Sequence, residues 1–157
     1  MKILYVNHTS VVSGAEHSLS TLLRALPSEV SPAVACPDGA FAENVRGLGI
    51  PVYQTPEATG SLRLHPLHTT RAVAELAAAA VAVRGIIRRT RPDVVHANSI
   101  RAGVILSLAT GRNGPPTIVH VRDCLPPGPV SFATRRLIVG AGATLISNSR
   151  YTEECYL

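Results

Sequence analysis

The segment from Met1 to Leu26 holds the first residues whose types and spacing could bind a charged ligand. A short apolar run, KILYV, leads into a polar turn, NHTSVVSG, and then into an amphipathic helical pattern that begins AEHSLSTLL. A glycine directly before a helix lets backbone N–H groups approach a ligand closely, and the helix dipole favours negative charge there. The pattern therefore predicts a phosphate cradle around Gly14. The sequence contains neither G-x-G-x-x-G nor G-x-x-x-x-G-K-[ST], which weighs against a dinucleotide site or a P-loop.

Further polar side chains follow three later apolar segments, at the places where we expect strands to end. They are His96, Asn98 and Ser99; Arg122 and Asp123; and Asn148, Ser149 and Arg150. In open α/β sheets, ligands bind beyond the carboxyl ends of the strands. We therefore expect these groups and the turn around Gly14 to gather at one edge of a sheet.

The elements that must position these groups are predicted from alternating sequence patterns. Short apolar runs bounded by Gly, Pro, Asp or Asn predict buried parallel strands at 2–7, 30–36, 52–54, 94–97, 117–121 and 144–148. Helical periodicity predicts helices at 15–26, 40–48, 69–90, 100–109 and 130–139, with another starting near Arg150. This order predicts a single-domain α/β fold with a doubly wound, right-handed, mostly parallel, Rossmann-like sheet and helices on both faces.

Length and composition limit the classes of function. A chain of 157 residues fits one domain with a self-sufficient core. The net charge of +5 is carried almost wholly by arginine, whose planar guanidinium matches phosphate or carboxylate. An anionic ligand or membrane surface would explain this bias, and so would the codon usage of a GC-rich genome. Because the arginines form no basic run and the chain has no Trp, nucleic-acid binding is not supported.

Cysteine usage and hydropathy bear on the compartment. Cys36, Cys124 and Cys155 are odd in number, far apart and without a C-x-x-C pair, so they indicate neither a disulfide framework nor a zinc site and imply a reducing compartment. Without a signal-peptide pattern or an apolar stretch of ~20 residues, we expect a cytoplasmic protein. The arginines ending the predicted helix 69–90 either suit the helix dipole or bind anionic lipid head groups, which leaves peripheral contact with the inner face of the membrane open.

Four motifs, each after or across a predicted strand, carry a resemblance to a known family. They are Ser13-Gly14-Ala15-Glu16, Asp93-Val94-Val95-His96-Ala97-Asn98, Val119-His120-Val121-Arg122-Asp123 and Ile146-Ser147-Asn148-Ser149-Arg150-Tyr151-Thr152-Glu153. In this order and at these intervals they resemble the N-terminal domain of family 4 glycosyltransferases, which carry G-G-A-E, D-V-V-H-x-H and (V/T)-x-H-D in the first three places. The resemblance covers residues 1–157 as one family 4-like domain, and it implies one half of the GT-B architecture of two facing Rossmann-like domains.

The resemblance also implies an activity and a set of site residues. The domain would be the acceptor side of a retaining, metal-independent glycosyltransferase that uses a nucleotide diphosphate sugar and a glycan, lipid-linked or small-molecule acceptor. Asp123 would be the catalytic residue, orienting an acceptor hydroxyl or steadying positive charge on an oxocarbenium-like transition state. The donor-phosphate contacts would be Ser13, Gly14 and Ala15, and the acceptor contacts would be His96, Asn98, Ser99, Arg122, Asn148 and Ser149. No metal or other cofactor is implied.

Several of these residues also have structural interpretations. Asp123 could cap its own loop, and His96 could be a satisfied core histidine. Asn148 and Ser149 have the residue types that cap any helix. Arg122 stands where relatives have histidine, so it is a poor base and fits a phosphate on the acceptor better than a proton relay.

Three further residues in the motifs are open to the same question. Gly14 could be a plain turn glycine. Glu16 is interpreted as a first-turn acid that suits the helix dipole. His120 falls within an apolar strand pattern and is interpreted as an inward-facing structural residue.

The half of a GT-B enzyme that holds the nucleotide and the donor sugar has no counterpart in the 157 residues. We therefore expect the chain to be inactive alone and to act with a C-terminal domain or a partner subunit. An exposed docking face for that half could also be covered by self-association, as in a homodimer. Two other function classes stay open: a non-catalytic binding module, and another Rossmann-like nucleotide-sugar enzyme such as an epimerase. The missing dinucleotide fingerprint weighs against the epimerase.

Overall fold

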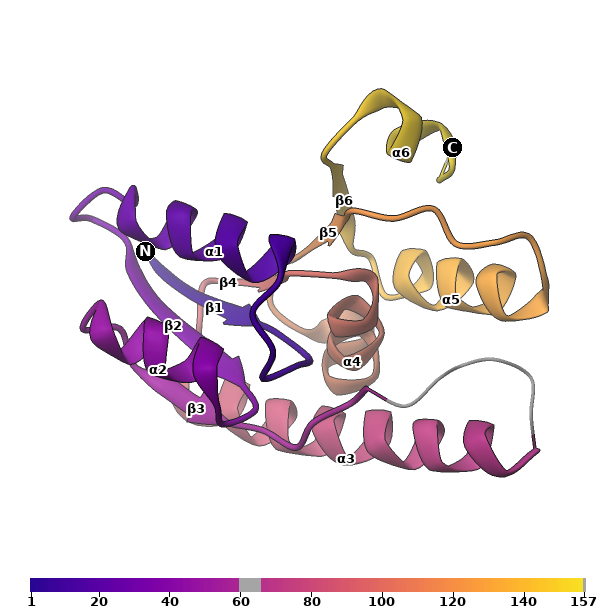
Figure 1. Ribbon diagram of the computed structural model, residues 1–157, viewed down its shortest axis with the longest axis horizontal. Helices are drawn as coiled ribbons and strands as arrows, with labels where there is room; N and C mark the ends of the chain where they lie inside the picture. Colours follow the sequence, from indigo (N-terminus) through magenta and orange to yellow (C-terminus); the bar gives the residue numbers. More distant parts are fainter. Residues whose placement is uncertain (60–65, 157) are drawn as a thin grey trace.

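The computed structural model describes residues 1–59 and 66–156. Within these residues, six parallel strands form one sheet in the order β3-β2-β1-β4-β5-β6 (Figure 1). The strands are β1 (Lys2–Val6), β2 (Ser31–Cys36), β3 (Val52–Gln54), β4 (Val94–Ala97), β5 (Thr117–Val121) and β6 (Thr144–Ser147). The helices are α1 (Gly14–Arg24), α2 (Ala40–Gly47), α3 (Pro66–Thr90), α4 (Ile100–Thr110), α5 (Pro129–Gly140) and α6 (Arg150–Glu154), with a 3-10 turn, η1 (Gly111–Asn113), after α4. The predicted doubly wound fold is confirmed.

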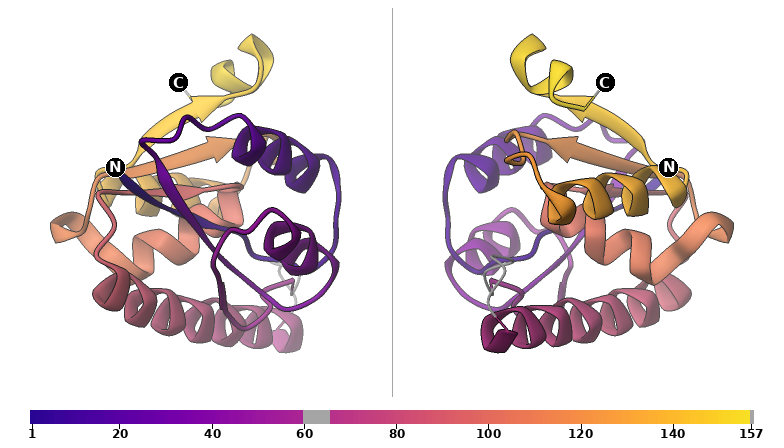
Figure 2. Two further views of the ribbon diagram at one scale, coloured as in Figure 1. Left: turned by 90° about the vertical axis from the view of Figure 1, so that its left-hand side faces the viewer. Right: turned by 90° about the vertical axis from the view of Figure 1, so that its right-hand side faces the viewer.

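Helices cover both faces of the sheet (Figure 2). On one face, α1 and α2 contribute Leu19 and Phe41 to a core that also contains Tyr5 of β1. On the other face, α3, α4 and α5 pack on the sheet through side chains such as Leu106 and Ile138. The two aliphatic cores explain how the chain fills its interior with few aromatic residues.

The register of the sheet brings the ends of β1 and β4 level, and β5 continues beyond them to Val121. Val6 of β1 pairs with Ala97 of β4, and Ala97 pairs with Val119 of β5. Because the strands are parallel, the loops that follow β1, β4 and β5 leave the sheet at one edge. The strand order reverses between β1 and β4, and such a switch point is where open α/β sheets bind ligands.

Gly103 lets α4 approach β5 closely. A Cβ atom at this position would lie 2.6 Å from Cγ1 of Val119, which real side chains do not tolerate. Ser99 caps the same helix, since its Oγ accepts a hydrogen bond from the backbone N–H of Ala102 at 3.1 Å. The close packing and the cap together fix the start of α4 at the sheet edge.

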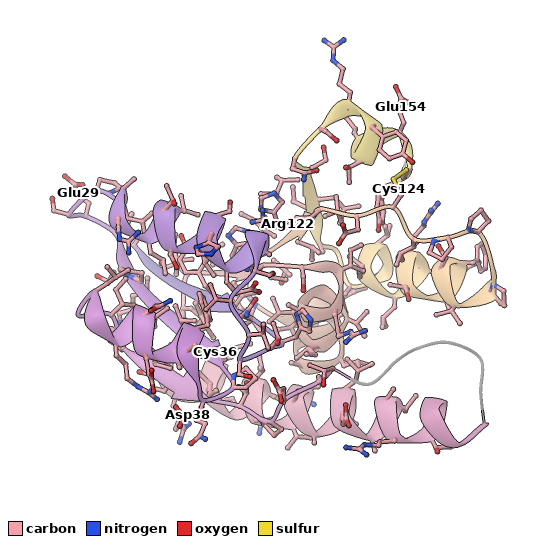
Figure 3. All side chains as sticks on the ribbon, viewed as in Figure 1. Glu29, Cys36, Asp38, Arg122, Cys124 and Glu154 are labelled. Atoms are coloured by element: carbon pink, nitrogen blue, oxygen red, sulfur yellow. A yellow bond between two sulfur atoms is a disulfide. The ribbon has the colours of Figure 1, made fainter. Side chains whose placement is uncertain are left out.

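Two of the three cysteines form a disulfide, so the expectation drawn from their spacing is wrong for this pair. Cys124 in the β5–α5 loop is bonded to Cys155 at the end of α6 (Figure 3). The two residues are 31 positions apart, and α5, β6 and α6 return the chain to the β5–α5 loop. Sequence spacing alone does not reveal this proximity. Cys36 is free and buried, and burial raises the pKa of its thiol to about 12.

The longest helix, α3, begins at Pro66, three residues before the predicted start. A proline at the first helical position has a suitable φ and no N–H to leave unpaired. Over residues 1–59 and 66–156, no helix has both the length and the apolar composition that crossing a bilayer requires.

Candidate functional site

Asn98 joins three loops at the sheet edge. Its Nδ2 donates hydrogen bonds to Oδ1 of Asn7 at 3.1 Å and to the carbonyl oxygen of Ala15 at 3.2 Å. Its Oδ1 accepts a hydrogen bond from Nη2 of Arg122 at 3.1 Å. Asn98 is only 1% exposed, so the bonds form largely out of contact with water, where lost partners are costly. The residue that the resemblance assigned to the acceptor is therefore a connector of the loops after β1, β4 and β5.

Arg122, which is labelled in Figure 3, extends this network to His120. Its Nε donates to the carbonyl oxygen of Asn98 at 3.3 Å, and its Nη2 lies 3.1 Å from Nδ1 of His120. Because a guanidinium only donates, Nδ1 of His120 accepts, and the proton of the neutral ring is on Nε2. Burial, followed by the charge of Arg122, lowers the pKa of His120. Burial also lowers the pKa of Arg122, although Glu16 and Asp123 favour its charge.

His96 packs against His120 of this network, and one of its ring nitrogens has no hydrogen-bond partner among the described residues. It is 8% exposed, and the unpaired nitrogen is Nε2. Its ring stacks on His120 with the centroids 6.0 Å apart and lies 5.2 Å from the ring of Tyr5. Burial, and then the charges of His120 and Arg122, lower the pKa of His96 to about 4. His96 is thus a neutral, buried histidine, and it differs from a satisfied core histidine in its unpaired nitrogen.

The start of α1 combines a buried carboxylate with two open N–H groups. The backbone N–H and the Oγ of Ser13 both donate to Oε2 of Glu16, at 3.0 and 2.5 Å. Burial opposes ionisation of Glu16, but the hydrogen bonds outweigh it and hold the pKa below its ordinary value. Glu16 is therefore a buried capping residue, and Ser13 is occupied by it. Among the described residues, no hydrogen bond uses the N–H groups of Gly14 and Ala15.

The space in front of Gly14 is open. A Cβ atom built on this glycine would meet no atom within 4 Å. Gly14 is also absent from the glycines with positive φ, so neither packing nor backbone conformation demands a glycine here. Exposed N–H groups at a helix start, with free space before them, are suited to an anion.

A pocket of about 550 Å³ opens at the same sheet edge and includes Asp123. His8 and Ser99 line it, and Nδ1 of His8 lies 3.1 Å from Oγ of Ser99. Burial, followed by the charge of Arg101, lowers the pKa of His8 to about 4, so this ring is neutral near pH 7. The β5–α5 loop and the first turn of α5 form the opposite wall.

The carboxylate of Asp123 makes no hydrogen bond to any other described residue, and the backbone of its loop is held from elsewhere. The carbonyl oxygen of Asp123 accepts a hydrogen bond from Tyr156 Oη at 3.1 Å, and Cys124 beside it is in the disulfide. The capping interpretation of Asp123 is therefore not supported. The loop is fixed and the carboxylate is free to meet a ligand.

Asn148 and Ser149 are occupied with the last helix. Oγ of Ser149 accepts a hydrogen bond from the N–H of Thr152 at 3.1 Å, and Oδ1 of Asn148 accepts one from Oγ1 of Thr152 at 2.9 Å. The N-cap interpretation is confirmed for Ser149, and Asn148 directly before it bonds to a side chain of the first turn. In the described part of the chain, no hydrogen bond links them to Asn98 or Arg122.

Sequence reasoning missed several parts of this site. Arg101 lines the pocket, and so does the proline-rich loop that contains Pro126, Pro127 and Pro129. The proline cluster directly after a predicted strand was the available signal, because a stiff loop at the carboxyl end of a parallel strand can form a pocket wall. Among the described residues, no group of three or more His, Cys, Asp or Glu side chains is arranged to hold a metal ion.

Comparison with known families decides how this geometry is classified. Residues 13–154 match the family model described as a glycosyl transferase 4-like domain. The chain belongs to this family. No curated protein matches this chain.

Solved structures place the domain within a larger architecture. HepE from Anabaena in complex with UDP has 25% sequence identity and a TM-score of 0.69, and the match covers 99% of this chain and 40% of the HepE chain. HepE in complex with UDP-glucose has 24% identity and a TM-score of 0.71, with the same coverage. MurG from Acinetobacter baumannii has 14% identity and a TM-score of 0.60, covering 96% of this chain and 42% of MurG. The glycosyl transferase 4-like domain therefore has the fold of the N-terminal part of GT-B glycosyltransferases and spans about two fifths of these chains.

Proposed function

We propose that this domain is the acceptor side of a glycosyltransferase that moves a sugar from a nucleotide diphosphate sugar to a hydroxyl group. The main support is the connection made by Asn98, which holds the loop of Gly14 and the loop of Asp123 at one sheet edge. Open N–H groups can stabilise the charge of a diphosphate, and a free carboxylate can orient a hydroxyl group. The complexes of HepE with UDP and UDP-glucose are consistent with this type of donor.

On the donor side, the N–H groups of Gly14 and Ala15 would face the diphosphate. Negative charge grows on the diphosphate as the sugar leaves, and helix N-termini stabilise such charge. The open space before Gly14 leaves room for phosphate oxygens to approach. Ser13 and Glu16 would act as positioning residues, because their mutual hydrogen bonds fix the first turn of α1.

On the acceptor side, the pocket would hold the acceptor with a hydroxyl facing Asp123. The carboxylate would orient that hydroxyl and steady the positive charge that develops on the sugar in an oxocarbenium-like transition state. Ser99, which lines the pocket with neutral His8, would contact the acceptor body. Asn98 and Arg122 would act as positioning residues. His96 would contact the acceptor, and its unpaired Nε2 supports this role.

The activity requires a second body that carries the donor nucleotide. We propose that a C-terminal GT-B domain or a partner subunit supplies it and that the 157-residue chain alone transfers no sugar. In line with the family resemblance, we also propose that the transfer retains the anomeric configuration and needs no metal ion.

Substitution of Asp123 tests the proposal. The domain combined with its C-terminal half is assayed with several nucleotide sugars, starting with UDP-glucose, and with a panel of hydroxylated acceptors. Asp123→Asn is expected to lower kcat/KM by about 100-fold, the usual size of a positioned acid–base contribution. Asp38→Asn is the matched control, because Asp38 is an exposed partner of Arg46 on α2.

Each outcome of this assay has a clear meaning. Equal activity of the two variants would overturn the role of Asp123, and transfer by the 157-residue chain alone would overturn the need for a second body. Binding of acceptors by the combined protein without transfer from any donor would favour a non-catalytic binding module. Loss of transfer on addition of EDTA would overturn metal independence.

A further inference from the structure

Arg101 places a cation in the pocket without an ion-pair partner in contact. This second residue of α4 is half-buried, and its Nη1 donates a hydrogen bond to the carbonyl oxygen of Ala58 at 3.0 Å. Among the described residues, Arg101 takes part in neither of the ion pairs found. Burial lowers the pKa of Arg101, and the charge of Glu75, which is paired with Arg71, opposes this only in part. A partly desolvated guanidinium with donors to spare is stabilised by an anionic group, most effectively by one that accepts two hydrogen bonds.

The remainder of the pocket wall is largely apolar. Ile100 and Val104 come from α4, and Leu125 comes from the β5–α5 loop together with its prolines. Burying an apolar group against such a wall is favourable because water is released from both surfaces. A volume of about 550 Å³ suits the compact body of a small ligand.

Arg101 and the proposed catalytic carboxylate of Asp123 line the same pocket and form no ion pair with each other. Arg101 bonds beside Ala58, and its charge contributes to the low pKa of His8. The charge of Asp123, in contrast, affects the pKa values of Arg122 and Tyr156. Because Arg101 does not pair with Asp123, an anion bound at Arg101 leaves the carboxylate of Asp123 available to a hydroxyl.

We infer that the acceptor is an amphipathic anion. Its apolar body fills the pocket between α4 and the β5–α5 loop, its phosphate or carboxylate pairs with Arg101, and its hydroxyl reaches Asp123. The role of the hydroxyl group rests on the proposed function. Binding of the amphipathic anion to the pocket does not require sugar transfer. Lipid head groups and soluble acids share this chemistry.

Calorimetric titration of the 157-residue chain with three simple probes tests the inference. n-Hexyl phosphate has both features, inorganic phosphate has only the charge, and n-hexyl β-glucoside has only the apolar chain. Hexyl phosphate is expected to bind at least tenfold more tightly than either of the others. Equal affinity for hexyl phosphate and inorganic phosphate, or no measurable binding of hexyl phosphate, would overturn the inference.

Variants assign the binding to the pocket. Arg101→Gln is expected to weaken hexyl phosphate binding about tenfold or more and to leave hexyl glucoside unaffected, whereas Arg84→Gln, on the exposed side of α3, changes neither. Arg101→Lys keeps the charge and should recover part of the affinity, which separates a charge effect from a loosened loop. Leu125→Asn should weaken hexyl phosphate binding several-fold, with the exposed Leu108→Asn as its control. If Arg101→Gln binds hexyl phosphate as well as Arg84→Gln does, the inference is wrong.

Two further arms identify the source of the anion and separate this inference from the proposed function. Arg101-dependent binding to phosphatidic acid vesicles, but not to phosphatidylcholine vesicles, would assign the anion to a lipid. Binding of hexyl phosphate without vesicle binding would assign it to a soluble acid, and both results keep the inference. Hexyl phosphate binding without sugar transfer by the combined protein would overturn only the proposed function. Transfer without hexyl phosphate binding would overturn only the inference.

Discussion

Arg122 holds Asn98 at two points, since Nη2 lies 3.1 Å from the side-chain Oδ1 and Nε lies 3.3 Å from the carbonyl oxygen of the same residue. Asn98 in turn bonds to Asn7 and Ala15. This pair therefore connects the loop that would face a donor with the loop that would face an acceptor. These hydrogen bonds hold together the loops after β1, β4 and β5 that carry the candidate site.

Asn98→Ala is expected to lower the free energy of unfolding by about 3 kcal/mol, because it leaves buried donors and acceptors of three loops without partners. Urea denaturation monitored by circular dichroism measures the loss. Asn44→Ala, on the exposed face of α2, should cost only a few tenths of a kcal/mol. A cost for Asn98→Ala no larger than that of the control would show that the network does not hold the loops.

Gly103→Ala is expected to destabilise the domain by about 1–3 kcal/mol, because the new methyl group would lie 2.6 Å from Cγ1 of Val119. Gly85→Ala is the control: it is also a helical glycine, its Cβ would meet nothing within 4 Å, and it should stabilise α3 by about 0.5–1 kcal/mol. Thermal unfolding of both variants compares the two effects. The double variant with Val119→Ala should regain part of the loss, and its failure to do so would place the strain elsewhere.

Gly14→Ala is expected to leave the free energy of unfolding unchanged or slightly raised, because its Cβ would occupy open space at the start of a helix. If phosphate oxygens approach the N–H groups there, the same methyl group should weaken donor binding by the combined protein about tenfold or more. Denaturation and UDP-glucose titration give the two measurements. Unchanged donor affinity would remove Gly14 from the donor site.

Reduction of the Cys124–Cys155 disulfide is expected to lower the free energy of unfolding by about 3–4 kcal/mol, the chain-entropy value for a loop of 31 residues. Urea denaturation with and without dithiothreitol measures this, and Cys124→Ser should reproduce the reduced state. Alkylation of the folded, oxidised chain should label little, because Cys36 is buried and burial raises its thiol pKa to about 12. Rapid labelling of two further cysteines without reductant would contradict the disulfide.

Stability is expected to fall on acidification between about pH 6.5 and pH 4. Burial lowers the pKa of His8 and of His96 to about 4, from an ordinary value of 6.5. The unfolded chain therefore binds more protons than the folded chain in this range, so the free energy of unfolding rises with pH. After allowance for solvent screening we expect about 2 kcal/mol from each histidine.

Urea midpoints measured from pH 4 to pH 8 follow this dependence. The double variant His8→Asn, His96→Gln should have a flatter profile over the same range. The lowered pKa of Glu16 leaves a residual loss at the acid end, since protonation of its carboxyl weakens the bonds from Ser13. A profile as steep as that of the unmodified chain would rule out the two histidines as its cause.

The fold could be predicted from the sequence because its signals are local. Each strand is a short apolar run with its own boundaries, as in Val94–Ala97, and the periodic pattern of a helix such as α1 matches the side chains that it buries. The gathering of polar residues at one sheet edge also followed, since parallel strands end on the same side. These features need no knowledge of distant contacts.

The inner structure of the site could not be predicted in the same way. Asn98 has partners 91, 83 and 24 residues away, and residue type alone does not separate a connector from a ligand contact. The partner of Cys124 and the pocket wall at Leu125 depend on how successive loops meet in space. Ser13 was assigned to a phosphate, but its hydrogen-bonding groups are taken by Glu16.

The bond between Cys124 and Cys155 has a practical consequence for the pocket. The residue after Cys124 is Leu125, which lines the pocket, and the residue before it is Asp123. In protein purified under oxidising conditions the disulfide restrains this loop, whereas in protein kept with thiols the loop is less restrained. The same compound would therefore meet a pocket wall of different rigidity in the two preparations. Ligand affinities measured on the two preparations would therefore differ, and the redox potential of the surroundings sets which form is present.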